Sequence, residues 1–114
     1  MTVSTATHCM LYITAGSKDE AKSIGLALVE EKLAACVNIM DGVTSIYRWK
    51  GEVEEAQEAV LVAKTRFDLA NAAIERVKEL HSNDVPCAVA YEMTLGLTKY
   101  LDWIDEETEH TPVT

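Results

Sequence analysis

The stretch KLAACVNI at residues 32–39 changes from the pattern of a helix end to that of a buried strand. About ten residues later, the stretch SIYRWKGE at residues 45–52 places two aromatic side chains and a cation just ahead of a turn. Runs of β-branched and aromatic residues bounded by Gly are typical of strands joined as a hairpin. The two stretches therefore predict one long β-hairpin that follows directly on a helix.

The length of this hairpin predicts assembly. Fourteen residues from 36 to 49 would span about 46 Å if fully extended, whereas a compact domain of this size has a radius of gyration of about 13 Å. We expect a bend at Asp41-Gly42, beyond which an arm leaves the core with Ile46, Tyr47 and Trp49. Another copy of the chain is the economical partner for these apolar groups. The alternative is an arm folded back over its own sheet.

The remaining segments complete a β-α-β-β-α-β order followed by one more helix. This order predicts an α+β, ferredoxin-like sandwich with both helices of the repeat on one face of the sheet. We expect a single domain over residues 8–107, with flexible tails at 1–7 and 108–114. The predicted elements are strand 8–14, helix 17–33, strand 36–49, turn 50–51, strand 52–65, helix 68–80, strand 87–95 and helix 98–107.

Three local signals set helix boundaries. Ser17 and Glu20 have the spacing of a capping box, in which the serine caps the helix and the glutamate reaches back. Asp68 is the expected cap of the second helix, and Pro86 prevents that helix from continuing. Gly25, inside the first helix, is expected to allow close packing on the sheet.

Composition restricts the classes of function. The 114 residues carry a formal charge of −9, which argues against nucleic-acid binding because phosphates require a Lys/Arg face. No apolar run of about 18 residues predicts a membrane span, and no signal peptide is apparent. Cys9, Cys36 and Cys87 form no paired motif, so we expect free thiols in a reducing compartment, the cytoplasm.

The returning strand carries the first candidate binding residues. Alternation places Glu58 and Lys64 on one face, but six residues of strand separate them by about 20 Å, so they are not a direct ion pair. Lys64 emerges from an apolar strand, where its ammonium reaches either a small anionic ligand or simply water. Tyr47 and Trp49 share a face, which favours interface packing or the wall of a pocket between subunits.

The best metal candidate follows the second helix. His81, Asp84 and Cys87 form a His-x-x-Asp-x-x-Cys pattern whose nitrogen, oxygen and sulfur donors suit zinc or copper. The alternative is a helix end with a solvated histidine, and strand alternation is expected to turn Cys87 inward. Cys36 is expected to be a small buried hydrophobe and not a nucleophile.

The stretches at 32–39 and 45–52 resemble the CutA family, small trimeric proteins named for divalent-cation tolerance, and the resemblance runs from Met10 to Ile104. It implies a trimer with strands paired across subunits, and a polar cleft between subunits to which Glu58 and Lys64 belong. The family pattern His-Pro-Tyr-x-x-Pro-Glu is changed here: Asn83 replaces the tyrosine and Cys87 the glutamate. The cysteine that some members carry in the first strand, linked with copper, aligns with Ile13.

These observations predict a cytoplasmic homotrimer that acts as a binding or regulatory module in the response to divalent ions. A divalent cation such as copper is the candidate cofactor, bound at His81 and Asp84. Alternatives are a structural scaffold or protein anchor without ligand chemistry, and a small-ligand sensor like the PII signalling proteins. No Ser/His/Asp, Cys/His or Gly-rich phosphate pattern predicts an enzyme. The expected cleft residues are Tyr47, Trp49, Glu58, Lys64 and His81.

Overall fold

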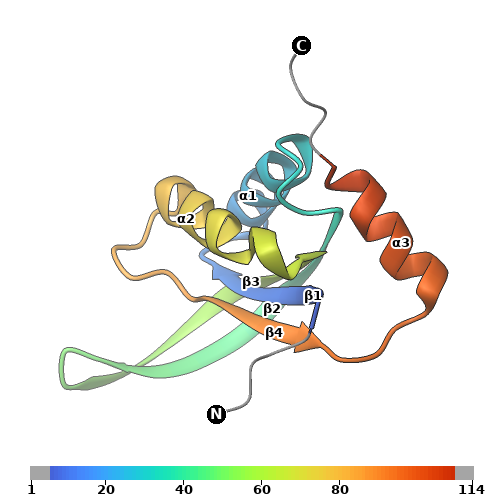
Figure 1. The fold of residues 1–114 in the computed structure, drawn as a ribbon. Helices are drawn as coiled ribbons and strands as arrows, with labels where there is room; N and C mark the ends of the chain where they lie inside the picture. The colour runs from blue at the N-terminus through green and yellow to red at the C-terminus, as the bar shows by residue number, and fades with distance from the viewer. Residues whose placement is uncertain (1–5, 110–114) are drawn as a thin grey trace.

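A computed structural model describes residues 6–109 as four strands and three α-helices (Figure 1). A short 3-10 helix, η1, precedes the second α-helix. The elements are β1 (His8–Ala15), α1 (Lys18–Glu30), β2 (Cys36–Trp49), β3 (Glu52–Arg66), η1 (Phe67–Leu69), α2 (Ala70–Leu80), β4 (Ala88–Met93) and α3 (Thr98–Glu107). Within residues 6–109, no helix combines the length and the apolar character that a membrane span requires.

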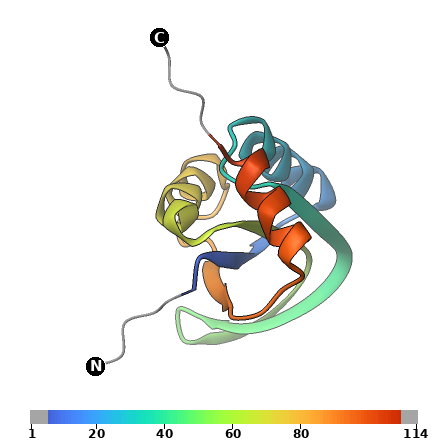
Figure 2. The same cartoon turned by 45° about the vertical axis from the view of Figure 1, so that its right-hand side comes forward.

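The strands form one antiparallel sheet in the order β2-β3-β1-β4. Helices α1 and α2 lie side by side over one face of this sheet, while α3 stands apart from them (Figures 1 and 2). The α+β class and the placement of the first two helices are therefore confirmed. Neither α1 nor α2 covers the opposite face of the sheet.

The core lies between the sheet and the α1–α2 layer. Alternate residues of β1 and β3 point into it, as period-two alternation requires. Its largest members are Leu11, Ile13, Ile24, Leu28 and Leu61, each no more than 1% exposed. Burying such a side chain stabilises the fold by about 1.5–3 kcal/mol. The predicted apolar face of the first helix is confirmed by the burial of Ile24 and Leu28.

The first helix ends earlier than predicted, at Glu30 and not near Leu33. Lys32 adopts a left-handed conformation with φ of 60°, which terminates the helical path. The amides of Leu33 and Ala34 both donate to the carbonyl of Leu28, so the chain folds back over the last turn. The predicted Ser17 cap is confirmed, because its Oγ accepts from the Glu20 amide at 3.1 Å.

The prediction that Asp68 caps the second helix is wrong. Asp68 lies within η1, and α2 begins two residues later without a side-chain cap. Asp68 Oδ1 lies 3.2 Å from Arg66 Nε, an ion pair that lacks hydrogen-bond geometry. The 3-10 turn provides the transition from strand to helix that a capping side chain would otherwise stabilise.

The hairpin agrees with its prediction. Lys50 and Gly51 both have positive φ, 49° and 84°, as a tight two-residue turn requires. A bulge between Met40 and Val43, with Gly42 at φ of 71°, lies where the bend was expected. Beyond the bulge, the paired strands extend as an arm away from the helices (Figure 1). The radius of gyration of 15.2 Å exceeds the compact value because of this arm.

Two residues assigned to the predicted tails contact the folded domain. Thr7 Oγ1 lies 2.9 Å from His8 Nδ1, and His8 Nε2 lies 2.8 Å from Asp105 Oδ1 of α3. Thr108 is fully buried, and its hydroxyl donates to the carbonyl of Ile104. The predicted tails also include residues 1–5 and 110–114, which lie outside the described residues.

Candidate functional site

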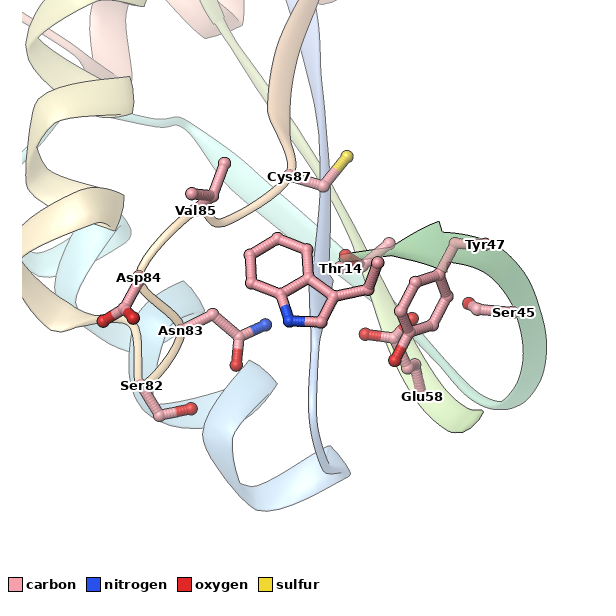
Figure 3. Close-up of a pocket in the computed structure, with 10 residues that line it drawn as sticks. Thr14, Ser45, Tyr47, Glu58, Ser82, Asn83, Asp84, Val85 and Cys87 are labelled. Atoms are coloured by element: carbon pink, nitrogen blue, oxygen red, sulfur yellow. The ribbon is translucent and has the colours of Figure 1, made fainter. Parts of the chain in front are cut away.

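A groove of about 580 Å³ lies between the hairpin arm and the loop that joins α2 to β4. Figure 3 shows Ser45, Tyr47 and Glu58 on the arm side and Ser82, Asn83 and Asp84 on the loop side, with the Asn83 amide pointing toward the arm. The lining residues are Thr14, Ser45, Tyr47, Trp49, Glu58, Ser82, Asn83, Asp84, Val85 and Cys87. Aromatic, carboxylate and neutral polar groups thus surround one space.

The bulge at residues 41 and 42 decides which arm residues reach the groove. Met40 pairs with Val60 and Val43 pairs with Glu58, so two residues of β2 oppose only Ala59 of β3. This extra residue exchanges the faces of β2 beyond it. Tyr47 and Trp49 consequently share a face with Glu58.

His81 fixes the loop on the other side of the groove. It is 9% exposed, and its Nε2 lies 2.7 Å from the carbonyl oxygen of Thr14. Its Nδ1 accepts from the Asn83 amide at 3.0 Å. A carbonyl only accepts and an amide N–H only donates, so the imidazole carries its proton on Nε2 and none on Nδ1. The loop is therefore tied to β1 through one neutral histidine.

Glu20 ties the same loop to the start of α1. Its Oε2 accepts from the Ser82 amide and its Oε1 from the Gly16 amide, each at 2.9 Å. Burial acts to raise the pKa of Glu20, but the hydrogen bonds from Ser82 and Gly16 outweigh it and lower that pKa. The glutamate of the predicted capping box thus reaches Gly16 and the groove loop.

Replacing Glu20 by Gln is expected to lower the free energy of unfolding by about 1–2 kcal/mol at neutral pH. Since the folded-state pKa is lowered, this stabilisation is complete above the unfolded-state pKa of about 4.3 and is lost as pH falls through the folded value. Urea melts of both chains at pH 7, 5 and 3 should therefore converge at low pH. The exposed Glu30→Gln variant is the control, and a difference undiminished at pH 3 would contradict the assignment.

The predicted cleft residues divide into two groups. Tyr47, Trp49 and Glu58 line the groove together. Lys64 lies at the far end of β3, opposite Cys36, with its Nζ 5.6 Å from the centre of the Tyr100 ring. His81 lies behind the groove wall and does not line it.

The predicted metal donors do not converge. Asp84 lines the groove, but both ring nitrogens of His81 are engaged with the backbone. Within residues 6–109, no three His, Cys, Asp or Glu side chains lie close enough to hold a metal ion. A tight copper or zinc site needs such a convergent set. The donors in the described part of one chain therefore do not fit either metal.

Two predictions about cysteines are wrong. Cys87 is exposed and lines the groove, because β4 begins after it and strand alternation does not apply to it. Cys36 is half-exposed, and its Sγ lies 3.3 Å from the Tyr100 hydroxyl. Sequence reasoning also missed Thr14. This residue lies two positions after Tyr12 on β1, so strand alternation places both side chains on the face away from the helices.

Comparison with known proteins agrees with the resemblance. The profile of the CutA1 divalent ion tolerance protein family matches residues 9–107. The divalent-cation tolerance protein CutA of Thermus thermophilus is 50% identical over 99 residues, which are 87% of this chain and 96% of that protein. The chloroplastic protein CutA 1 of rice is 38% identical over 96% of this chain, which spans only 62% of the rice protein.

A solved structure gives the same result. The periplasmic divalent cation tolerance protein CutA from Archaeoglobus fulgidus superposes with a TM-score of 0.87 at 43% identity, covering 90% of this chain and 99% of that one. The alignment therefore takes in nearly the whole of that structure. The chain therefore belongs to the CutA1 divalent ion tolerance protein family.

Proposed function

We propose that this chain is a trimeric binding module of the divalent-cation tolerance type, whose ligand site is the groove beside the hairpin arm. The observation that carries the proposal is the groove itself, since it brings aromatic and carboxylate side chains of the arm against a loop fixed by His81. Such a convergent set is expected of a binding site and is not needed by a bare scaffold.

Exposed apolar surface supports assembly. The sheet face opposite the helices carries Tyr12, Val89 and Tyr91, which are 37%, 44% and 59% exposed. On the arm, Ile46 pairs with Glu55 and Val53 with Arg48, so Ile46 and Val53 share the face away from Tyr47; they are 69% and 65% exposed. Exposed apolar side chains gathered on a face in this way mark an interface in a soluble protein, and here they lie on both faces of the sheet. The strand order β2-β3-β1-β4 supports the finer, ferredoxin-like assignment.

Replacing Ile46 by Asp tests the assembly. We expect the native chain to show three times its 12.6 kDa mass by light scattering at low micromolar concentration. A charge at position 46 removes apolar burial of about 1.5–3 kcal/mol at each interface, so the variant should dissociate at concentrations at least tenfold higher. Leu26→Asp is the matched control, because Leu26 is 60% exposed on α1. A monomeric native chain would contradict the proposal.

Within residues 6–109 of one subunit, no convergent donor set supports a copper site. The geometry of His81 and Asp84 does not support the metal site predicted there, although copper binding stays an open prediction for an assembled trimer. We propose that ion tolerance follows from what the groove binds. A role as a small-ligand sensor agrees with this arrangement, whereas a pure scaffold leaves the groove unexplained.

We further propose a binding role without catalysis, and a cytoplasmic location. Free thiols at Cys9, Cys36 and Cys87 support a reducing compartment. Relatives carry names that place them elsewhere, the periplasm and the chloroplast. Fractionation of the source cells, with thiol labelling before lysis, tests the location.

A further inference from the structure

The groove face of the hairpin arm combines aromatic rings with acidic side chains. In the antiparallel register Tyr47 pairs with Glu54 and Trp49 with Glu52, so each ring has a carboxylate directly across the hairpin. Directly opposed residues lie on the same face of a sheet. Glu58 lies on this face as well and reaches the groove. The arm therefore presents two rings among three carboxylates.

The loop that forms the opposite wall of the groove adds a negative charge and no positive charge. Asp84 lines it beside the neutral Ser82 and Asn83, and among the described residues no Lys, Arg or His lines the groove. The expectation of a small anionic ligand rested on Lys64, which lies outside the groove. An anion would meet two lining carboxylates and the field of a chain with formal charge −9.

One ammonium group of the arm itself already contacts an aromatic ring of the groove face. The Nζ of Lys50 lies 5.8 Å from the centre of the Trp49 ring, within the range of a cation–π interaction. The indole is still 45% exposed. This contact is of the kind that an ammonium ligand would make with the indole. Since a compact metal ion lacks a convergent donor set here, a larger cation with an organic surface fits better.

We propose that the groove binds a small organic cation, an amine or quaternary ammonium, against Trp49 and Tyr47, with Glu58 and Asp84 as its counter-charges. Aromatic faces and carboxylates together select ammonium groups over both anions and neutral molecules. The volume of about 580 Å³ lies within the range of small-molecule sites. This inference rests on the proposed function, because it names the ligand class of the same groove.

Cys87 gives a direct probe of the charge in the groove. We would react the native chain with two methanethiosulfonate reagents, one carrying trimethylammonium and one carrying sulfonate, and measure modification of each cysteine by peptide mass spectrometry. Cys36 is the internal control, because it pairs with Lys64 outside the groove. Cys9 should stay silent, since it is fully buried and burial raises the pKa of its thiol to about 11.

The expected result is a preference of about tenfold for the cationic reagent at Cys87, relative to Cys36. The paired substitutions Glu58→Gln and Asp84→Asn should remove most of this preference while the Cys36 rates stay unchanged. A reagent preference at Cys87 equal to that at Cys36, or one shifted toward the anionic reagent, would overturn the inference.

Protection by a ligand tests the aromatic wall. Choline should slow alkylation of Cys87 by iodoacetamide, whereas its uncharged isostere 3,3-dimethylbutan-1-ol should not. Trp49→Leu should abolish the protection and Trp49→Phe should retain part of it, with circular dichroism confirming that both variants fold. Protection by the alcohol equal to that by choline would refute a cation site.

The mass of the same samples separates this inference from the proposed function. A trimer in which Cys87 shows neither charge preference nor choline protection refutes the organic-cation ligand and leaves the assembly standing. A monomer that shows both supports the ligand class and refutes the assembly.

Discussion

Replacement of His81 by Ala is expected to lower the free energy of unfolding by about 2–3 kcal/mol and to release the loop that forms one wall of the groove. The imidazole is buried and joins two backbone groups, the Thr14 carbonyl and the Asn83 amide. Removing it leaves a cavity and deprives both groups of their partner, and each loss costs on the order of 1 kcal/mol or more. Urea denaturation measures the total cost, and hydrogen exchange at the Asn83 amide measures the release of the loop.

Two conservative variants separate the contributions of the two hydrogen bonds that His81 makes. The side-chain oxygen of Asn at position 81 takes roughly the place of Nδ1 and can still accept from the Asn83 amide, whereas Gln places a donor near Nε2 and can still reach Thr14. Protection of the Asn83 amide should therefore persist in His81→Asn and fall in His81→Gln. Equal stability of His81→Ala and the native chain would show that the histidine does not hold the loop.

Local sequence signals predicted much of the fold. The turn at residues 50 and 51 and the bend at 41 and 42 were predictable because each depends on glycine at a positive φ. The Ser17 cap followed from side-chain chemistry within one turn of helix. Close packing at Gly25 also agrees with the structure, since a Cβ there would lie 3.1 Å from Val37 Cγ1.

The site was predicted only in part, because its geometry depends on contacts between distant segments. Tyr47, Trp49 and Glu58 were expected together from alternation and from the family. The burial of His81 depends on the end of β1, 67 residues earlier, and a local pattern contains no trace of that contact. Cys87 was assigned to a strand that begins one residue later. A boundary error of one residue was enough to reverse its expected direction.

Insertion of one residue between Glu58 and Ala59 is the second change with a large expected effect, because the bulge determines which face of the arm meets the groove. Two residues of β2 oppose Ala59 at the bulge, and a residue added to β3 there gives the second of them a partner and restores an unbroken ladder. The added residue moves every side chain of the arm beyond it to the other face. Tyr47 and Trp49 should then leave the groove, and Ile46 should turn toward it.

Ring-current shifts in NMR spectra test this exchange. In the native chain, Trp49→Leu should move the amide resonances of loop residues 82–85, because the indole and this loop line one groove. In the chain with the insertion the same substitution should leave those resonances in place. Deletion of Gly42 is the control, since it also removes the bulge but keeps every pair from Val43 with Glu58 to Trp49 with Glu52, so the loop shifts should persist there. Loop shifts that persist after the insertion as well would mean that tertiary packing, not register, orients the aromatic face of the arm.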